Sequence, residues 1–252
     1  ISSVVGITSI IKGGYMARSG FPGFPAEALA FFRGLARNNH RDWFLPRKAV
    51  FEQSVKQPMR ELVTALNVAM AGFAPEYATD PDKAIFRIYR DVRFSRDKKP
   101  YKEHLAASFN VRGMNHGHGG FYCSVSHKEV AVGGGLYMPE PAALVAIRNH
   151  IAENHAELRR ILANPKVRRL LGEMQGEKLA RVPKGFACDH PAADLLRFKQ
   201  FFLYAELPPE LATSPKLYPE IVDRFRVMMP FLRFLNAPLP KVKKIDARDL
   251  LA

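Results

Sequence analysis

The middle of the chain alternates apolar and polar residues, and this pattern constrains the fold more than any other feature of the sequence. A period of two is typical of strands that rest one face on a core. Strands are predicted at residues 84–94, 105–112, 120–127, 129–132 and 201–207. The Gly-rich stretch 113–120 is typical of a hairpin loop. We therefore expect a largely antiparallel central sheet of about five strands.

The residues on both sides of this block recur at the spacing of helices. The clearest case is 139–162, where Leu144, Ile147 and Ile151 fall on one stripe. Helices are also predicted at 25–38, at 46–71 with a break at Gln57-Pro58, and at 165–174, 192–199 and 219–235. Helices from both ends of the chain around one sheet indicate an α+β fold. We assign 16–236 to a single domain, 1–15 to artificial or upstream sequence, and 237–252 to a basic, mobile tail.

Composition limits the surroundings in which the protein can work. The chain has 252 residues, 47% hydrophobic and 25% charged, which is enough to form a core. Two cysteines make neither a disulfide framework nor a zinc site, so we expect a reducing cytoplasm, no metal and no cofactor. The longest uncharged apolar stretch, Leu62 to Pro75, is shorter than the roughly 20 residues that span a bilayer. We therefore expect no membrane association.

The strongest functional signal is the run from Arg87 to His104. It holds seven Lys/Arg, three acids, one His and two Tyr in eighteen residues, within a chain of net charge +14. On a strand, Arg87, Tyr89 and Asp91 would share one face, and we expect Arg87 and Asp91 to be less exposed than ordinary surface charges. Because the planar Arg fork suits carboxylate or phosphate, the run predicts an anion site. A sheet face laced by Arg–Asp pairs is an equally good interpretation.

The other motifs are less specific. There is no Walker A, dinucleotide fingerprint, nucleophile elbow or zincin pattern. Gly133–Gly135 follows a strand and precedes a helix, which fits either a phosphate-binding turn or a tight turn alone. Trp43 and Phe44 fit either loop anchors or a stacking platform for a base. His116 and His118 have no third ligand nearby in sequence, so we predict no metal site there.

Four motifs together carry a resemblance to a known family. They are Asn-Asn-x-Arg-x-Trp-Phe at 38–44, Arg-Ile-x-Arg-Asp-x-Arg-Phe-Ser-x-Asp-Lys-x-Pro-Tyr-Lys at 87–102, Gly-Gly-Gly-x-Tyr-x-Pro at 133–139, and Pro-Lys-Gly-Phe at 183–186. Over about residues 21–236 the chain resembles DUF2461, an uncharacterised family of conserved hypothetical proteins of bacteria and fungi. The resemblance implies a soluble single-domain protein, and it implies no activity or catalytic residue.

Three functions are compatible with these observations. The first is binding of a phosphorylated or otherwise anionic small molecule in a pocket, with Asp91 or His104 as the proton-transfer group if hydrolase- or transferase-type chemistry follows. The second is non-specific nucleic-acid binding on a basic surface. The third is a structural or partner-binding protein in which the basic run braces the fold. The first hypothesis assigns ligand contacts to Arg87, Tyr89, Arg90, Arg93, Lys98, Lys99, Tyr101, Lys102 and Tyr137.

Overall fold

The computed structural model describes residues 20–111 and 117–240. The predicted leading segment 1–15 therefore lies outside the described residues, as do residue 112 of the predicted strand 105–112 and residues 113–116 of the predicted loop. Of the predicted tail 237–252, only the first four residues are described. Leu239 among them is buried, so the start of this tail packs on the domain.

Helices precede and follow one sheet along the chain. Before the sheet come α1 (Ala26–Arg37), α2 (Arg41–Phe44), η1 (Leu45–Arg47), α3 (Lys48–Val50), η2 (Phe51–Lys56), α4 (Gln57–Met70), η3 (Pro75–Tyr77) and α5 (Pro81–Ala84). The sheet contains β1 (His104–Phe109), β2 (Gly120–Ser126), β3 (Val130–Leu136) and β4 (Phe201–Leu207). Between β3 and β4 lie α6 (Pro141–Leu162), α7 (Pro165–Leu171) and α8 (Ala193–Leu196), and after β4 lie η4 (Pro209–Thr213) and α9 (Leu217–Asn236). This order confirms the predicted α+β fold.

The sheet is antiparallel throughout, with its strands in the order β1-β2-β3-β4. The expected number of about five strands is one too many. The predicted strand 84–94 makes only isolated bridges, Ile85 to Ala107 and Tyr89 to Tyr101, because most of it leaves the sheet. In contrast, β3 runs further than predicted and includes Gly133–Gly135. The glycine triplet is therefore strand, and the phosphate-binding turn suggested for it is wrong.

The predicted break at Gln57-Pro58 is present as a change of helix type. Phe51–Lys56 is a π-helical segment that leads without interruption into α4, where Pro58 is the second residue. Proline has no N–H to donate, and its ring crowds the carbonyl four residues earlier. The wider π turn accommodates both effects, so the helical run continues.

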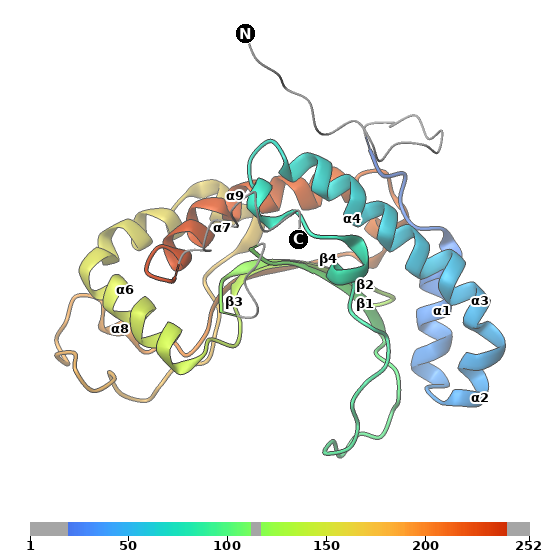
Figure 1. The fold of residues 1–252 in the computed structure, drawn as a ribbon, viewed down its shortest axis with the longest axis horizontal. Helices are drawn as coiled ribbons and strands as arrows, with labels where there is room; N and C mark the ends of the chain where they lie inside the picture. Colours follow the sequence, from blue (N-terminus) through green and yellow to red (C-terminus); the bar gives the residue numbers. More distant parts are fainter. Residues whose placement is uncertain (1–19, 112–116, 241–252) are drawn as a thin grey trace, which may run out of the picture.

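One face of the sheet carries the core. Figure 1 shows α4 and α9 side by side over this face, and α9 packs on β2 and β3. The ring of Phe225 stacks on Phe121 with centroids 4.3 Å apart and meets the edge of Phe109 at 5.7 Å. Stacked and edge-on aromatic pairs of this kind add to the apolar area that they bury.

No described helix packs on the opposite face of the sheet, which we call the open face (Figure 1). Cross-strand partners share a face, so the register assigns its members. They are His104, Ala106, Ser108, Gly120, Tyr122, Ser124, Ser126, Ala131, Gly133, Gly135, Phe202, Tyr204 and Glu206. A Cβ on Gly133 would come within 2.9 Å of the Tyr204 ring, so the absence of a side chain at Gly133 leaves room for this ring.

Gly135 supports a prediction about stability. Its φ is +141°, and a Cβ there would meet the Phe201 carbonyl oxygen at 2.1 Å. We expect Gly135→Ala to lower the free energy of unfolding by about 1–3 kcal/mol or more. This is the usual cost of holding a residue with a side chain at a positive φ. Gly72→Ala is the control, because its Cβ would meet only the Ala69 carbonyl oxygen at an ordinary 3.6 Å. Urea unfolding of both variants tests this, and equal stabilities would contradict it.

In the part of the chain that the structure describes, no helix is both long enough and apolar enough to cross a bilayer.

Candidate functional site

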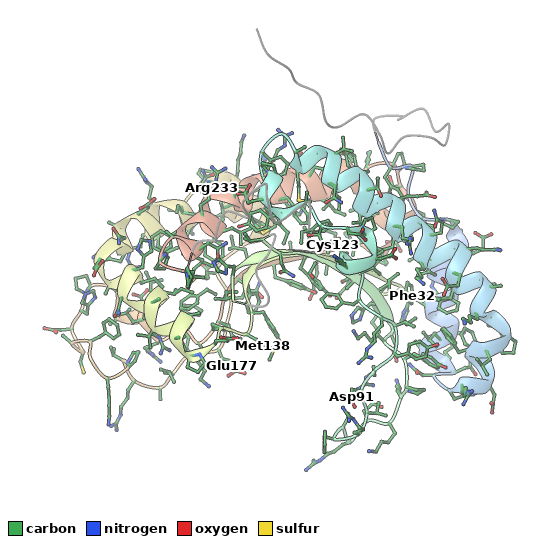
Figure 2. The ribbon with its side chains drawn as sticks, in the orientation of Figure 1. Phe32, Asp91, Cys123, Met138, Glu177 and Arg233 are labelled. Atoms are coloured by element: carbon green, nitrogen blue, oxygen red, sulfur yellow. The ribbon has the colours of Figure 1, made fainter. Side chains whose placement is uncertain are left out.

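The basic run forms a two-stranded arm, residues 85–103, that extends away from the sheet (Figures 1 and 2, where Asp91 marks its outer part). Backbone hydrogen bonds join its limbs from Lys102 N to Ile88 O at 2.8 Å and from Arg90 N to Pro100 O at 2.8 Å. Beyond the last of these bonds the chain turns through exposed residues, and Phe94 there is 96% exposed. The apolar-polar alternation therefore reflects burial at the base of the arm, where Ile88 is 3% exposed, and only pairing between the limbs further out.

Aromatic residues anchor the base of the arm to the N-terminal helices. Tyr101 is 4% exposed and stacks on Phe44 with ring centroids 4.2 Å apart. The Asn39 side chain donates to the Tyr101 carbonyl oxygen at 3.0 Å and accepts from the Tyr101 backbone N–H at 3.1 Å. Phe44 is buried, and Trp43 is half-buried against Phe31 with the Arg47 guanidinium 4.6 Å from its ring centroid, which favours the anchor interpretation of the Trp-Phe pair over a stacking platform.

Three cations of the arm form ion pairs within it. Arg93 binds both oxygens of Asp91, at 3.0 and 2.7 Å. Arg90 pairs with Asp97 at 2.6 Å, and Lys99 with Glu103 at 2.8 Å. Each pair has at least one well-exposed partner, and such surface pairs stabilise a fold by at most about 1 kcal/mol. The buried Arg–Asp brace that one hypothesis requires is therefore not present in the arm.

The other four arm cations, Arg87, Arg96, Lys98 and Lys102, have no carboxylate within salt-bridge distance among the described residues. Lys98 donates to the Val92 carbonyl oxygen at 3.1 Å, and Lys102 lies over the Phe86 ring at 5.2 Å. Arg87 and Asp91 are both exposed, so the expectation that they are shielded is wrong. Arg87 alternates with the buried Ile88 and so lies on the exposed side of the base, whereas Asp91 lies in the outer part of the arm, which has no core beneath it.

Asp91 is poorly suited to proton transfer. The hydrogen bonds from the Arg93 side chain hold the pKa of the Asp91 carboxyl below its usual range. A general base works best with a pKa near the working pH, so this geometry favours Asp91 as a partner of Arg93. His104 lies at the other end of the arm, where β1 begins. The structure does not bring the two proposed catalytic groups together.

His104 instead lines a pocket of about 230 Å³ on the open face. The lining residues are Glu103, His104, Tyr122, Ser124, Ser126, Lys128, Glu129 and Tyr204. Two carboxylates face a single lysine here, and Lys128 lies 3.9 Å from Glu103. The balance of charge in this pocket does not suit an anion.

Burial favours the uncharged forms of three side chains that line this pocket, those of His104, Tyr122 and Tyr204. It raises the pKa of Tyr204 to about 12, with Glu129 contributing in the same direction. It likewise raises the pKa of Tyr122 and lowers the pKa of His104. Neutral imidazole and phenol groups can donate and accept hydrogen bonds, so the pocket suits an uncharged polar group. The apolar-polar alternation in the sequences of β2 and β4 could have predicted that each tyrosine points to the polar face of the sheet. It could not have predicted that Tyr122 and Tyr204 lie near each other, because that depends on the register of the strands between them.

His104 leads to a prediction about pH. Its pKa is lowered in the fold by burial, so between the folded pKa and the ordinary value of about 6.5 the unfolded chain binds more protons. Stability from this residue is therefore full above about pH 6.5 and is lost as the pH falls through the folded pKa. We expect His104→Gln to flatten the decline in unfolding free energy between pH 7 and pH 5. Urea unfolding at both pH values tests this, and an unchanged decline would contradict it.

The remaining predicted ligand contact, Tyr137, lies far from the arm in the fold. It is exposed at the end of β3 and packs against Phe202, with ring centroids 5.4 Å apart. The predicted site thus divides among three places: the arm, the open-face pocket and a crevice beside Tyr137. Within residues 20–111 and 117–240 there is no group of three or more His, Cys, Asp or Glu side chains that could hold a metal ion.

Comparison with known proteins gives a family and no close relative. The model of a family described as "Conserved hypothetical protein (DUF2461)" matches residues 27–234, which is most of the chain. The chain belongs to the DUF2461 family. Neither the curated proteins nor the solved structures contain a match. Within the matched range, the long Arg/Lys motif at 87–102 lies in the arm, and the Gly-Gly-Gly-x-Tyr-x-Pro motif at 133–139 covers the end of β3 and the wall of the crevice that follows it.

Proposed function

We propose that the arm binds polyanions, specifically the phosphate backbone of nucleic acid. The observation that carries this proposal is that the cations of the arm lie along a protruding element and not around a cavity. Seven Lys/Arg against three acids leave a net charge of +4 over 87–103. A polymer of phosphates can contact cations spread over such a length, whereas a small anion needs them to converge.

Each alternative from the sequence receives less support from the geometry. Neither described pocket is lined by Arg87, Arg90 or Arg93, which disfavours a small anion at this motif. The exposed Arg–Asp pairs disfavour a structural brace. The chain also lacks a recognised base-reading motif, so we expect binding without sequence preference.

The test is a salt titration of the full chain with a fluorescently labelled 20-mer duplex and a single strand of the same sequence. We expect Kd values of about 10⁻⁴–10⁻⁶ M at physiological salt. The affinity should fall steeply as the salt concentration rises. Fluorescence anisotropy at 50 and 200 mM salt measures both. Absence of binding at 50 mM salt, or binding that salt does not weaken, would overturn the proposal. A second 20-mer duplex of unrelated sequence is the control, and tight binding of only one of the two duplexes at 200 mM salt would show base reading in place of backbone contact.

A further inference from the structure

The second described cavity is a crevice of about 460 Å³ between the start of α6 and the segment that leads into β4. Figure 2 shows Met138 and Glu177 close together beside the start of α6, and both belong to the wall of the crevice. Its apolar surface comes from Tyr137, Met138, Leu144 and Leu179, and its cations are Arg148 and Lys199. The volume lies within the range of small-molecule sites.

Arg148 is the unusual member of this wall. It is 91% buried in α6, since only 9% of its surface is exposed. Its Nη2 donates to the Phe198 carbonyl oxygen at 3.0 Å, and its buried Nε has no hydrogen-bond partner. No carboxylate in the described chain lies within salt-bridge distance of it. A guanidinium has five donors, so most of its capacity is unused in a place where an uncompensated charge is costly.

The net charge of the crevice indicates which kind of ligand would pair with the Arg148 guanidinium. Lys199 already pairs with Glu177 at 3.1 Å, so these two charges offset each other. Arg148 then leaves one net positive charge, which matches a monoanion better than a dianionic phosphate. Carboxylate oxygens fit the Arg fork, and the apolar wall requires a ligand with a hydrocarbon part.

We propose that this crevice binds an organic monocarboxylate, with the carboxylate on Arg148 and an apolar body against Tyr137, Met138 and Leu144. The site is separate from the arm and does not depend on the nucleic-acid proposal. Met138 is 76% exposed and Tyr137 63% exposed, so the apolar part of the wall is open to a ligand from solvent.

Calorimetric titration of the full chain with octanoate tests the proposal. Octanol has the same chain without the charge, acetate has the charge without the chain, and octyl phosphate has a dianionic head. We expect one octanoate per chain and at least tenfold weaker binding of the other three. No binding of octanoate, or equal binding of octanol, would overturn the proposal. Tighter binding of octyl phosphate would overturn the choice of a carboxylate.

Arg148→Met keeps the apolar stem and removes the charge, and replacing a buried charge by an apolar group of similar size is often tolerated. We expect it to weaken octanoate at least tenfold, whereas Arg160→Met, on the exposed side of the same helix, leaves the affinity unchanged. If Arg148→Met fails to fold, the Nε–H resonances of ¹⁵N-labelled wild type report a carboxylate bound at the Arg148 guanidinium, because it changes the environment of the buried Nε–H. Octanoate should shift one buried arginine Nε–H signal and octanol should not. An unshifted set of signals, or unaltered affinity in Arg148→Met, would overturn the assignment.

Discussion

Replacing Arg87, Arg96 and Lys98 together by glutamine is expected to remove much of the salt dependence of nucleic-acid binding. These residues are exposed and have no carboxylate partner among the described residues, so they are free to contact phosphate. Each phosphate contact with duplex contributes about 0.9 to the slope of log K against log salt. Three lost contacts should make the fall in affinity between 50 and 200 mM salt about 40-fold smaller than in the wild type. Anisotropy titrations of both proteins with the labelled duplex measure this difference.

The matched control replaces Lys166, Arg168 and Arg169 of α7 by glutamine. These three residues are also exposed, and the variant loses the same charge from the opposite end of the molecule (Figure 1). If the two triple variants behave alike, net charge and not the arm accounts for the binding. Stability should change little in either, because substitutions of exposed side chains usually stay within about 0.5 kcal/mol.

Replacing Tyr101 by alanine is expected to lower the free energy of unfolding by about 3–5 kcal/mol, as for other buried aromatic residues. The ring is 4% exposed and lies against Phe44 and Tyr89, so its loss leaves a cavity where the arm joins the domain. We also expect the backbone amides of Arg90 and Lys102, which donate the hydrogen bonds between the two limbs, to exchange faster with solvent. Urea unfolding measures the first effect, and hydrogen–deuterium exchange measures the second.

Two further variants test whether the effect comes from the buried ring of Tyr101. One removes only its hydroxyl, and the other removes an exposed aromatic ring. Tyr101→Phe keeps the stack on Phe44 and should cost far less than Tyr101→Ala. Tyr89→Ala removes a ring that is 49% exposed and should also cost less. If Tyr101→Ala is as stable as the wild type, the aromatic cluster does not anchor the arm.

Local periodicity was sufficient for the elements that pack on the core. The helical spacing in 139–162 and 219–235 corresponds to α6 and α9, and the alternation at 201–207 corresponds to β4. These patterns are reliable because one face of each element is buried, and burial selects apolar residues at the period of the backbone. The family could also be recognised from motifs alone, since it depends on residue order and not on contacts.

Tertiary structure decided whether an alternating segment lies on the core or leaves it. Segment 84–94 alternates as a strand does, yet its outer half pairs only with the other limb of the arm. Alternation of apolar and polar residues indicates an extended backbone, but it does not indicate whether the segment packs on the core or on another extended segment. The glycines of β3 were ambiguous for the related reason that their partners, Tyr204 and Phe202, are distant in sequence.

The candidate sites show the same division. The sequence by itself determined the concentration of cations in 87–102 and the membership of the family. Only the tertiary structure placed those cations on an exposed arm, gathered His104 with Tyr122 and Tyr204, and enclosed Arg148 beside Tyr137 and Lys199. The physical reason is that charge and residue order are local properties of a chain, whereas burial and convergence depend on which distant segments pack together.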